Sequence, residues 1–161
     1  MSFLKKGLLA TAFISFFAYV IPVQADEFDD MYGIKDQCKP GRRQAYAINY
    51  EHIGVPLGKV YTSNDLKKAI IAAAEEQGWK LTTTGGNSIT ASLLVRNKHT
   101  SIVDISWKAS EYSIKYKNSV NLRAELCNNK VIIHKNYNVW VGNLKKAIDL
   151  NISQLDSVTT N

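Results

Sequence analysis

The chain has 161 residues, a formal net charge of +6 at pH 7 and two cysteines. This length suits one domain with a hydrophobic core and leaves little room for a second domain. The charged residues are unevenly distributed along the chain, and most of it after the first acidic stretch is basic. A basic domain favours either attraction to anionic surfaces, such as phosphate-bearing envelope lipids, or simple solubility. The basic body follows a short acidic stretch, whose charged residues are Asp26, Glu27, Asp29, Asp30 and Asp36.

Residues 1–25 are typical of a cleaved signal peptide. Lys5 and Lys6 precede an apolar stretch at 7–20, and Pro22 and Ala25 supply a helix break and the small residue required at a cleavage site. The alternative is a retained membrane anchor, because residues 7–23 are just long enough to span a bilayer. The abrupt change to acidic residues at Asp26 favours cleavage. We therefore expect an exported chain that does not span a membrane, has no lipid anchor and does not bind nucleic acid.

Cys38 and Cys127 are expected to form a disulfide, since an isolated pair in an oxidising compartment has only one possible pairing. The alternative is two free thiols. Neither cysteine belongs to a Cys-x-x-Cys motif, so a thioredoxin-like redox role has no support.

Residues 26–43 show no hydrophobic period and are predicted to be an irregular leader held mainly by Cys38.

Residues 44–51 alternate in the manner of a strand, and Gly54, Pro56 and Gly58 predict a turn after it. A helix is then predicted to begin at Thr62 or Ser63 and to stop at Gly78, because apolar residues recur there every three or four positions.

From residue 79 the period changes to two, which predicts four strands at 79–84, 88–96, 101–107 and 111–117. Their short connections make them an antiparallel meander. A long polar crossover at 118–135 leads to an amphipathic helix from about 136 to 155.

The predicted fold class is α+β. Two helices pack on one face of a four-stranded meander that has a possible fifth edge strand, in the order (β)-α-β-β-β-β-α. Residues 44–155 form this single domain, and 156–161 a frayed tail.

No catalytic constellation stands out. The sequence lacks a nucleophile elbow, a phosphate-binding glycine loop and a dinucleotide fingerprint. His52, His99 and His134 have no second ligand at metal-binding spacing. We therefore predict no catalytic residues, no metal site and no cofactor. Six aromatic residues lie on predicted inward faces: Trp79, Trp107, Tyr112, Tyr116, Tyr137 and Trp140. They could line a ligand pocket, but we favour the interpretation that they fill the core.

The outward face of the predicted sheet carries hydroxyl and basic side chains. Its basic residues are Lys80, Arg96, Lys115 and Lys117, and only Asp104 opposes them. Such a face is usually solvated sheet surface. The alternative is a surface that binds phosphate groups of envelope lipids or a protein partner.

Three motifs give the chain a resemblance to known proteins: VRNKH at 95–99, YSIKY at 112–116 and IHKNYNVW at 133–140. With them, residues 60–155 resemble a family of small exported proteins and lipoproteins of Gram-negative bacteria that has no assigned activity. The resemblance implies a periplasmic location and an α+β domain, and it carries over no catalytic residues. The polar residues around these motifs form either a polar site or a hydrogen-bonded lock between the crossover and the last helix: Arg96, His99, Ser119, Asn121, His134, Tyr137 and Asn138.

The sequence as a whole favours a non-enzymatic periplasmic domain that binds an envelope component or a protein partner. The alternative is a small periplasmic hydrolase, or a small-ligand-binding protein, with a polar pocket near His134. The sequence leaves both the ligand and the oligomeric state open.

Overall fold

A computed structural model describes residues 38–56 and 60–155 of the chain. The predicted signal peptide, residues 26–37 of the predicted leader and the predicted tail at 156–161 lie outside this part. Within it, neither helix combines the length and hydrophobicity that a membrane span requires.

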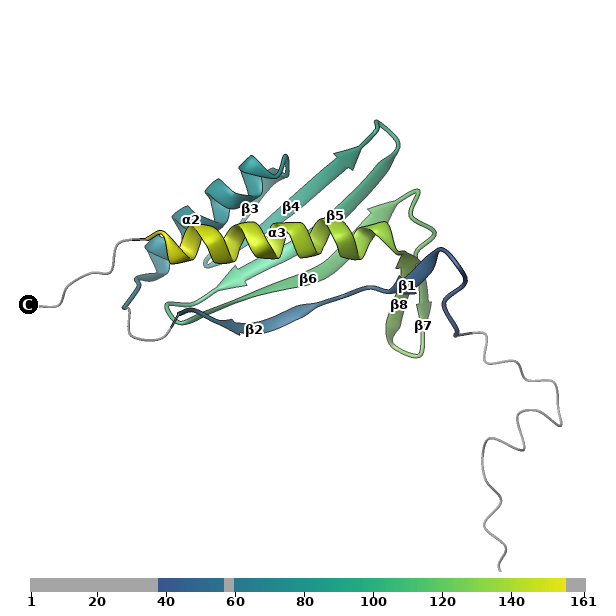
Figure 1. Cartoon of the computed structure of the whole chain (residues 1–161), viewed down its shortest axis with the longest axis horizontal. Helices are drawn as coiled ribbons and strands as arrows, with labels where there is room; N and C mark the ends of the chain where they lie inside the picture. The colour runs from purple at the N-terminus through teal and green to yellow at the C-terminus, as the bar shows by residue number, and fades with distance from the viewer. Residues whose placement is uncertain (1–37, 57–59, 156–161) are drawn as a thin grey trace, which may run out of the picture. The chain divides into compact units, whose positions relative to one another are not determined.

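Five antiparallel strands form the main sheet in the order β2-β6-β5-β4-β3. Their bounds are β2 Tyr50–Gly54, β3 Lys80–Gly85, β4 Ser88–Val95, β5 His99–Trp107 and β6 Glu111–Val120. Strands β3 to β6 are the predicted meander, and β2 is the fifth strand at its edge (Figure 1). Gly85 and Gly86 turn the chain between β3 and β4 with positive φ angles of 97° and 59°, which glycine adopts readily.

A second sheet of three strands accompanies the main sheet, and the sequence did not predict it. It has the order β1-β8-β7, with β1 at Gln44–Tyr46, β7 at Glu125–Cys127 and β8 at Lys130–His134. The predicted strand at 44–51 is therefore two strands in different sheets, and the predicted crossover contains a hairpin. Strands β1 and β7 have only three residues each, too few to show a period of two, and the five residues of β8 do not alternate between apolar and polar. The hairpin turn rests on Asn128 and Asn129, whose φ angles are 48° and 62°.

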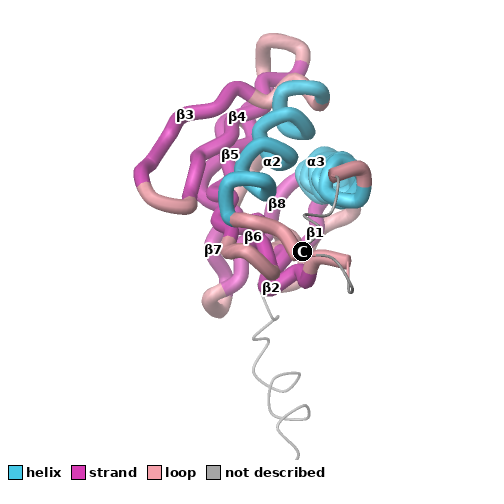
Figure 2. The backbone as a smooth tube through the Cα atoms, turned by 90° about the vertical axis from the view of Figure 1, so that its left-hand side faces the viewer, coloured by secondary structure: helices cyan, strands magenta, loops and turns pink. Residues whose placement is uncertain are grey.

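Two helices follow the prediction closely. Helix α2 (Ser63–Glu76) begins after Thr62, whose Oγ1 accepts the Asp65 N–H at 3.1 Å, while the Asp65 carboxylate accepts the Thr62 N–H at 2.9 Å. This reciprocal cap satisfies two amide groups at the start of the helix. Helix α3 covers Asn136–Ser153. Figure 2 shows both helices on the same side of the main sheet.

The hydrophobic core lies between the main sheet and the two helices. Ala69, Ala73 and Ala74 are buried on α2 and allow it to pack closely against its neighbours. The aromatic residues fill this core as predicted. Four of them are buried: Trp79, Trp107, Tyr112 and Tyr137. Two more, Tyr116 and Trp140, are partly buried and pack against the core. The α+β fold with both helices on one face is thereby confirmed.

The predicted disulfide between Cys38 and Cys127 is present and bridges 89 residues of sequence. Cys38 precedes β1 and Cys127 ends β7, which are the two outer strands of the small sheet. The Tyr46 hydroxyl also donates a hydrogen bond to the Cys38 carbonyl at 2.6 Å. The disulfide therefore connects the segment before β1 to the end of β7, two strands that do not pair with each other.

Removal of this disulfide should destabilise the domain. For the Cys38→Ser, Cys127→Ser double variant we expect the free energy of unfolding to fall by about 2–5 kcal/mol, because the long loop is no longer closed in the unfolded state. Urea titration followed by circular dichroism measures the change. Reductant should lower the midpoint of the wild type and leave that of the double variant unchanged; a wild type indifferent to reductant would contradict the prediction.

Candidate functional site

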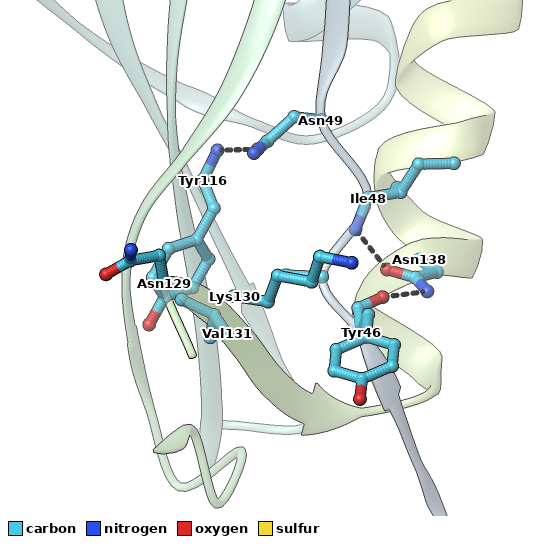
Figure 3. Close-up of a pocket in the computed structure, with 9 residues that line it drawn as sticks. Tyr46, Ile48, Asn49, Tyr116, Asn129, Lys130, Val131 and Asn138 are labelled. Atoms are coloured by element: carbon cyan, nitrogen blue, oxygen red, sulfur yellow. Dashed lines mark hydrogen bonds between the residues drawn. The ribbon is translucent and has the colours of Figure 1, made fainter. Parts of the chain in front are cut away.

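A cavity of about 580 Å³, here called the junction pocket, lies where the two sheets meet. The chain between β1 and β2 forms one wall, the β7–β8 hairpin a second, and β6 and α3 the remainder (Figure 3). Its lining residues are Tyr46, Ala47, Ile48, Asn49, Tyr116, Asn129, Lys130, Val131 and Asn138. Of these, sequence reasoning had singled out Asn138 as a polar-site candidate and Tyr116 as an inward aromatic residue.

Two asparagines hold the chain in place where it passes from one sheet to the other. Asn138 Oδ1 accepts the Ile48 N–H at 2.9 Å, and its Nδ2 donates to the Tyr46 carbonyl at 2.9 Å. Asn49 Oδ1 accepts the Tyr116 N–H at 2.8 Å, in place of the backbone carbonyl that a neighbouring strand would offer to β6 (Figure 3). Asn138 therefore joins α3 to the end of β1 and to the β1–β2 connection, whereas the lock considered from the sequence would join α3 to the crossover.

The junction pocket presents hydrogen-bond donors and aromatic rings. Lys130 Nζ lies 5.5 Å from the centre of the Tyr46 ring, a favourable cation–π distance. The Nδ2 group of Asn49 makes no hydrogen bond within residues 38–56 and 60–155, and Asn129 is exposed at the rim. Since none of the lining residues is acidic, the pocket suits a ligand rich in acceptor oxygens.

A second cluster, here called the cationic end, gathers arginine and histidine side chains around the start of α3: Arg42, Arg43, Arg96, His99, Arg123 and His134. Backbone hydrogen bonds on both sides of β8 bring the cluster together. The Lys135 N–H donates to the Arg43 carbonyl at 3.0 Å, and the His134 N–H donates to the Leu122 carbonyl at 2.9 Å. Arg43 and Arg123 are thereby held on opposite sides of the same junction.

The β4–β5 turn joins this cluster through Asn121. The Asn121 Nδ2 group donates to the Lys98 carbonyl at 2.7 Å, and the His99 Nδ1 group donates to the Asn121 carbonyl at 2.9 Å. These two bonds fix the turn that carries Arg96. Asn121 is thus a structural member of the predicted polar group.

Two hollows open at the cationic end, and His134 lines both. The first, of about 280 Å³, is lined by Val95, Arg96, His99, Leu122, His134, Asn136 and Trp140. The second, of about 360 Å³, is lined by Gly41, Arg42, Arg43, Gln44, Arg123 and His134. Sequence reasoning missed the arginines at 42, 43 and 123, because the first two lay in the predicted leader and the third in the predicted crossover.

His134 occupies a strongly positive environment. Its Nδ1 accepts the Asn136 N–H at 3.2 Å, at the first residue of α3. Burial lowers the pKa of His134 below its ordinary value, and positive charge from neighbouring groups lowers the pKa further; these groups are His99, Arg43, Lys135 and Arg123. The side chain is therefore held in its neutral form.

The predicted polar group does not form one site. Arg96, His99 and His134 line the first hollow, whereas Asn138 lines the junction pocket. Ser119 Oγ lies 3.2 Å from the Tyr116 hydroxyl. Tyr137 is fully buried with its ring 5.5 Å from that of Tyr116, and burial raises the pKa of Tyr137.

The predicted basic face is largely neutralised. Lys115 forms an ion pair with Glu51 at 3.2 Å, and Lys117 forms one with Asp104 at 2.9 Å. Burial tends to raise the pKa of Asp104, but hydrogen bonds from Thr90 and Lys117 outweigh burial and hold the pKa below its usual value. Lys80 is exposed on the outward face, and Arg96 belongs to the cationic end. The face is therefore mainly a solvated surface with local ion pairs.

A further polar cluster links α3 to the main sheet. The Tyr112 hydroxyl donates to Asp149, which also accepts a hydrogen bond from Lys145 one turn earlier. Burial and the Asp149 carboxylate raise the pKa of Tyr112, so this hydroxyl stays protonated. The cluster anchors the helix.

Within the described ranges, no group of three or more His, Cys, Asp and Glu side chains is placed to hold a metal ion.

The Asn138→Ala variant should be destabilised. The change leaves the Ile48 N–H and the Tyr46 carbonyl without their partners, so we expect the free energy of unfolding to fall by about 1–3 kcal/mol in urea titrations. Asn143→Ala, at an exposed position of the same helix, is the matched control and should change stability by less than about 0.5 kcal/mol. Equal losses in the two variants would contradict the role of Asn138.

The fold should lose stability when His134 becomes protonated. Its folded pKa is below the unfolded value of about 6.5, so the unfolded chain binds more protons just below that pH. The stability contributed by the neutral ring is present above this range and is lost as the pH falls through it. Between about pH 7.5 and pH 5.5 we expect the thermal midpoint to drop further for the wild type than for His134→Gln. Parallel drops would contradict this.

Comparisons with known proteins assign no family to the chain. No protein-family model matches it, and no curated protein matches its sequence. The resemblance to small exported proteins of Gram-negative bacteria stays a prediction.

Proposed function

We propose that the chain is a non-enzymatic periplasmic domain, related to the small exported proteins that it resembles, and that it binds an envelope component in the junction pocket. The ligand class that suits the pocket is a glycan that carries hydroxyl and carboxylate groups, as peptidoglycan does.

The composition of the pocket carries this proposal. Lys130, Asn49 and Asn129 offer donors for acceptor oxygens, while the Tyr46 and Tyr116 rings offer apolar surface for the faces of sugar rings. The volume of about 580 Å³ is in the range of small-molecule sites.

The disulfide supports the periplasmic location. Cys38 anchors the segment that leads into the wall at Tyr46, and Cys127 is followed directly by the hairpin turn that leads into the wall at Lys130. A disulfide that holds the walls of a pocket is compatible with an oxidising compartment such as the periplasm.

The hydrolase alternative is disfavoured by the state of His134. Because Nδ1 accepts the Asn136 N–H, the neutral ring carries its proton on Nε2. An Nε2–H group donates a hydrogen bond and cannot take a proton from a nucleophile. The arrangement therefore suits ligand binding better than general-base catalysis.

Binding to peptidoglycan can be tested with matched turn variants. We expect the oxidised protein to co-sediment with purified sacculi, and Asn129→Gly with Lys130→Gln to weaken this binding by about tenfold. Glycine suits the positive φ at 129, so the variant should fold normally.

The matched control is Asn128→Gly with Lys67→Gln. It changes the other residue of the same turn and removes one exposed lysine on α2. The control should sediment like the wild type. A wild type that stays in the supernatant, or a control that loses binding equally, would contradict the proposal. Binding that protease treatment of the sacculi abolishes would assign the pocket to an envelope protein instead.

A further inference from the structure

We propose that the cationic end is a second binding site, which takes a phosphate group. This inference goes beyond the proposed function, because the two hollows and the junction pocket share no lining residue.

The arginines of the cationic end have no carboxylate partner in the part of the chain that the structure describes. Four arginines line the two hollows, none of the lining residues is acidic, and no ion pair within residues 38–56 and 60–155 involves these arginines. On the outward sheet face of the same domain, Lys115 and Lys117 both have carboxylate partners. Like charges repel, so a cluster of this kind is stabilised by a bound anion.

Two arginines of the cationic end have an unusual backbone conformation. Arg96 and Arg123 each have a φ of 53°, in the left-handed region that long side chains rarely adopt. Glycine or asparagine would fit both positions better, yet both carry an arginine that lines a hollow. Strained residues of this kind are found preferentially at functional sites.

The donor chemistry points to phosphate. Guanidinium groups present planar pairs of N–H groups that match the oxygens of a phosphate. His134 lies between the two hollows with its proton on Nε2, which adds a neutral donor. His99 uses Nδ1 to bond the Asn121 carbonyl, so only its Nε2 remains for a ligand. Several cations around two adjoining hollows favour an anion of more than one charge.

The test uses a variant that keeps the fold while it removes charge. Arg96→Asn with Arg123→Asn places asparagine at both left-handed positions, so the thermal midpoint should be maintained. Two probes are used with the oxidised full chain: inorganic phosphate in calorimetric titration, and vesicles of phosphatidylcholine with or without phosphatidic acid. We expect the double variant to bind at least about tenfold more weakly to whichever probe the wild type binds.

The control is Lys68→Gln with Lys146→Gln, which removes the same number of charges at exposed positions that line neither hollow. It should bind like the wild type. Binding of phosphate without binding of vesicles would identify a free phosphate compound as the ligand, and binding of acidic vesicles would identify a lipid headgroup. The inference would be overturned if neither probe binds, if chloride at equal ionic strength competes as well as phosphate, or if the control loses as much affinity as the double variant.

Discussion

The passage of the chain from the small sheet to the main sheet, at residues 47–49, is the constraint on which both sites depend. An extended backbone that leaves one sheet loses partners before it reaches the next, and the Asn138 amide replaces them at Tyr46 and Ile48. The Asn49 amide in turn supplies a partner for the Tyr116 N–H on β6. The space left between the sheets becomes the junction pocket. The same geometry pairs β1 with β8, which sets Arg43 beside Lys135 at the start of α3.

The two polar regions of the domain show how context decides what a basic side chain does. On the main sheet, neighbouring strands place Glu51 and Asp104 beside lysines, and the charges cancel locally. At the cationic end, a turn, a loop and a strand end converge without a carboxylate among the residues that line the hollows. Solvated ion pairs contribute little to stability, whereas arginines without carboxylates beside them can present their N–H groups to an anion, as proposed for the cationic end.

Local patterns predicted most of the fold and little of the site. The two helices, the meander and the inward aromatic residues followed from periods that extend over six or more residues. The small sheet did not, because β1 and β7 have three residues each, β8 does not alternate, and the pairing joins β1 to residues 132–134 far along the chain. The same limit hid Arg43 and Arg123, which become neighbours of His134 only through long-range backbone bonds. Within the described residues the disulfide was the exception, since two cysteines allow a single pairing.

The position of the disulfide has a consequence for when the protein can act. Cys38 and Cys127 flank two walls of the junction pocket, so oxidation adds a covalent link to the backbone hydrogen bonds that already join β1 to β8. A newly made chain in a reducing cytosol would hold these walls through the short strands β1, β7 and β8 alone. Under the proposed function, full bracing of these walls therefore requires an oxidising compartment.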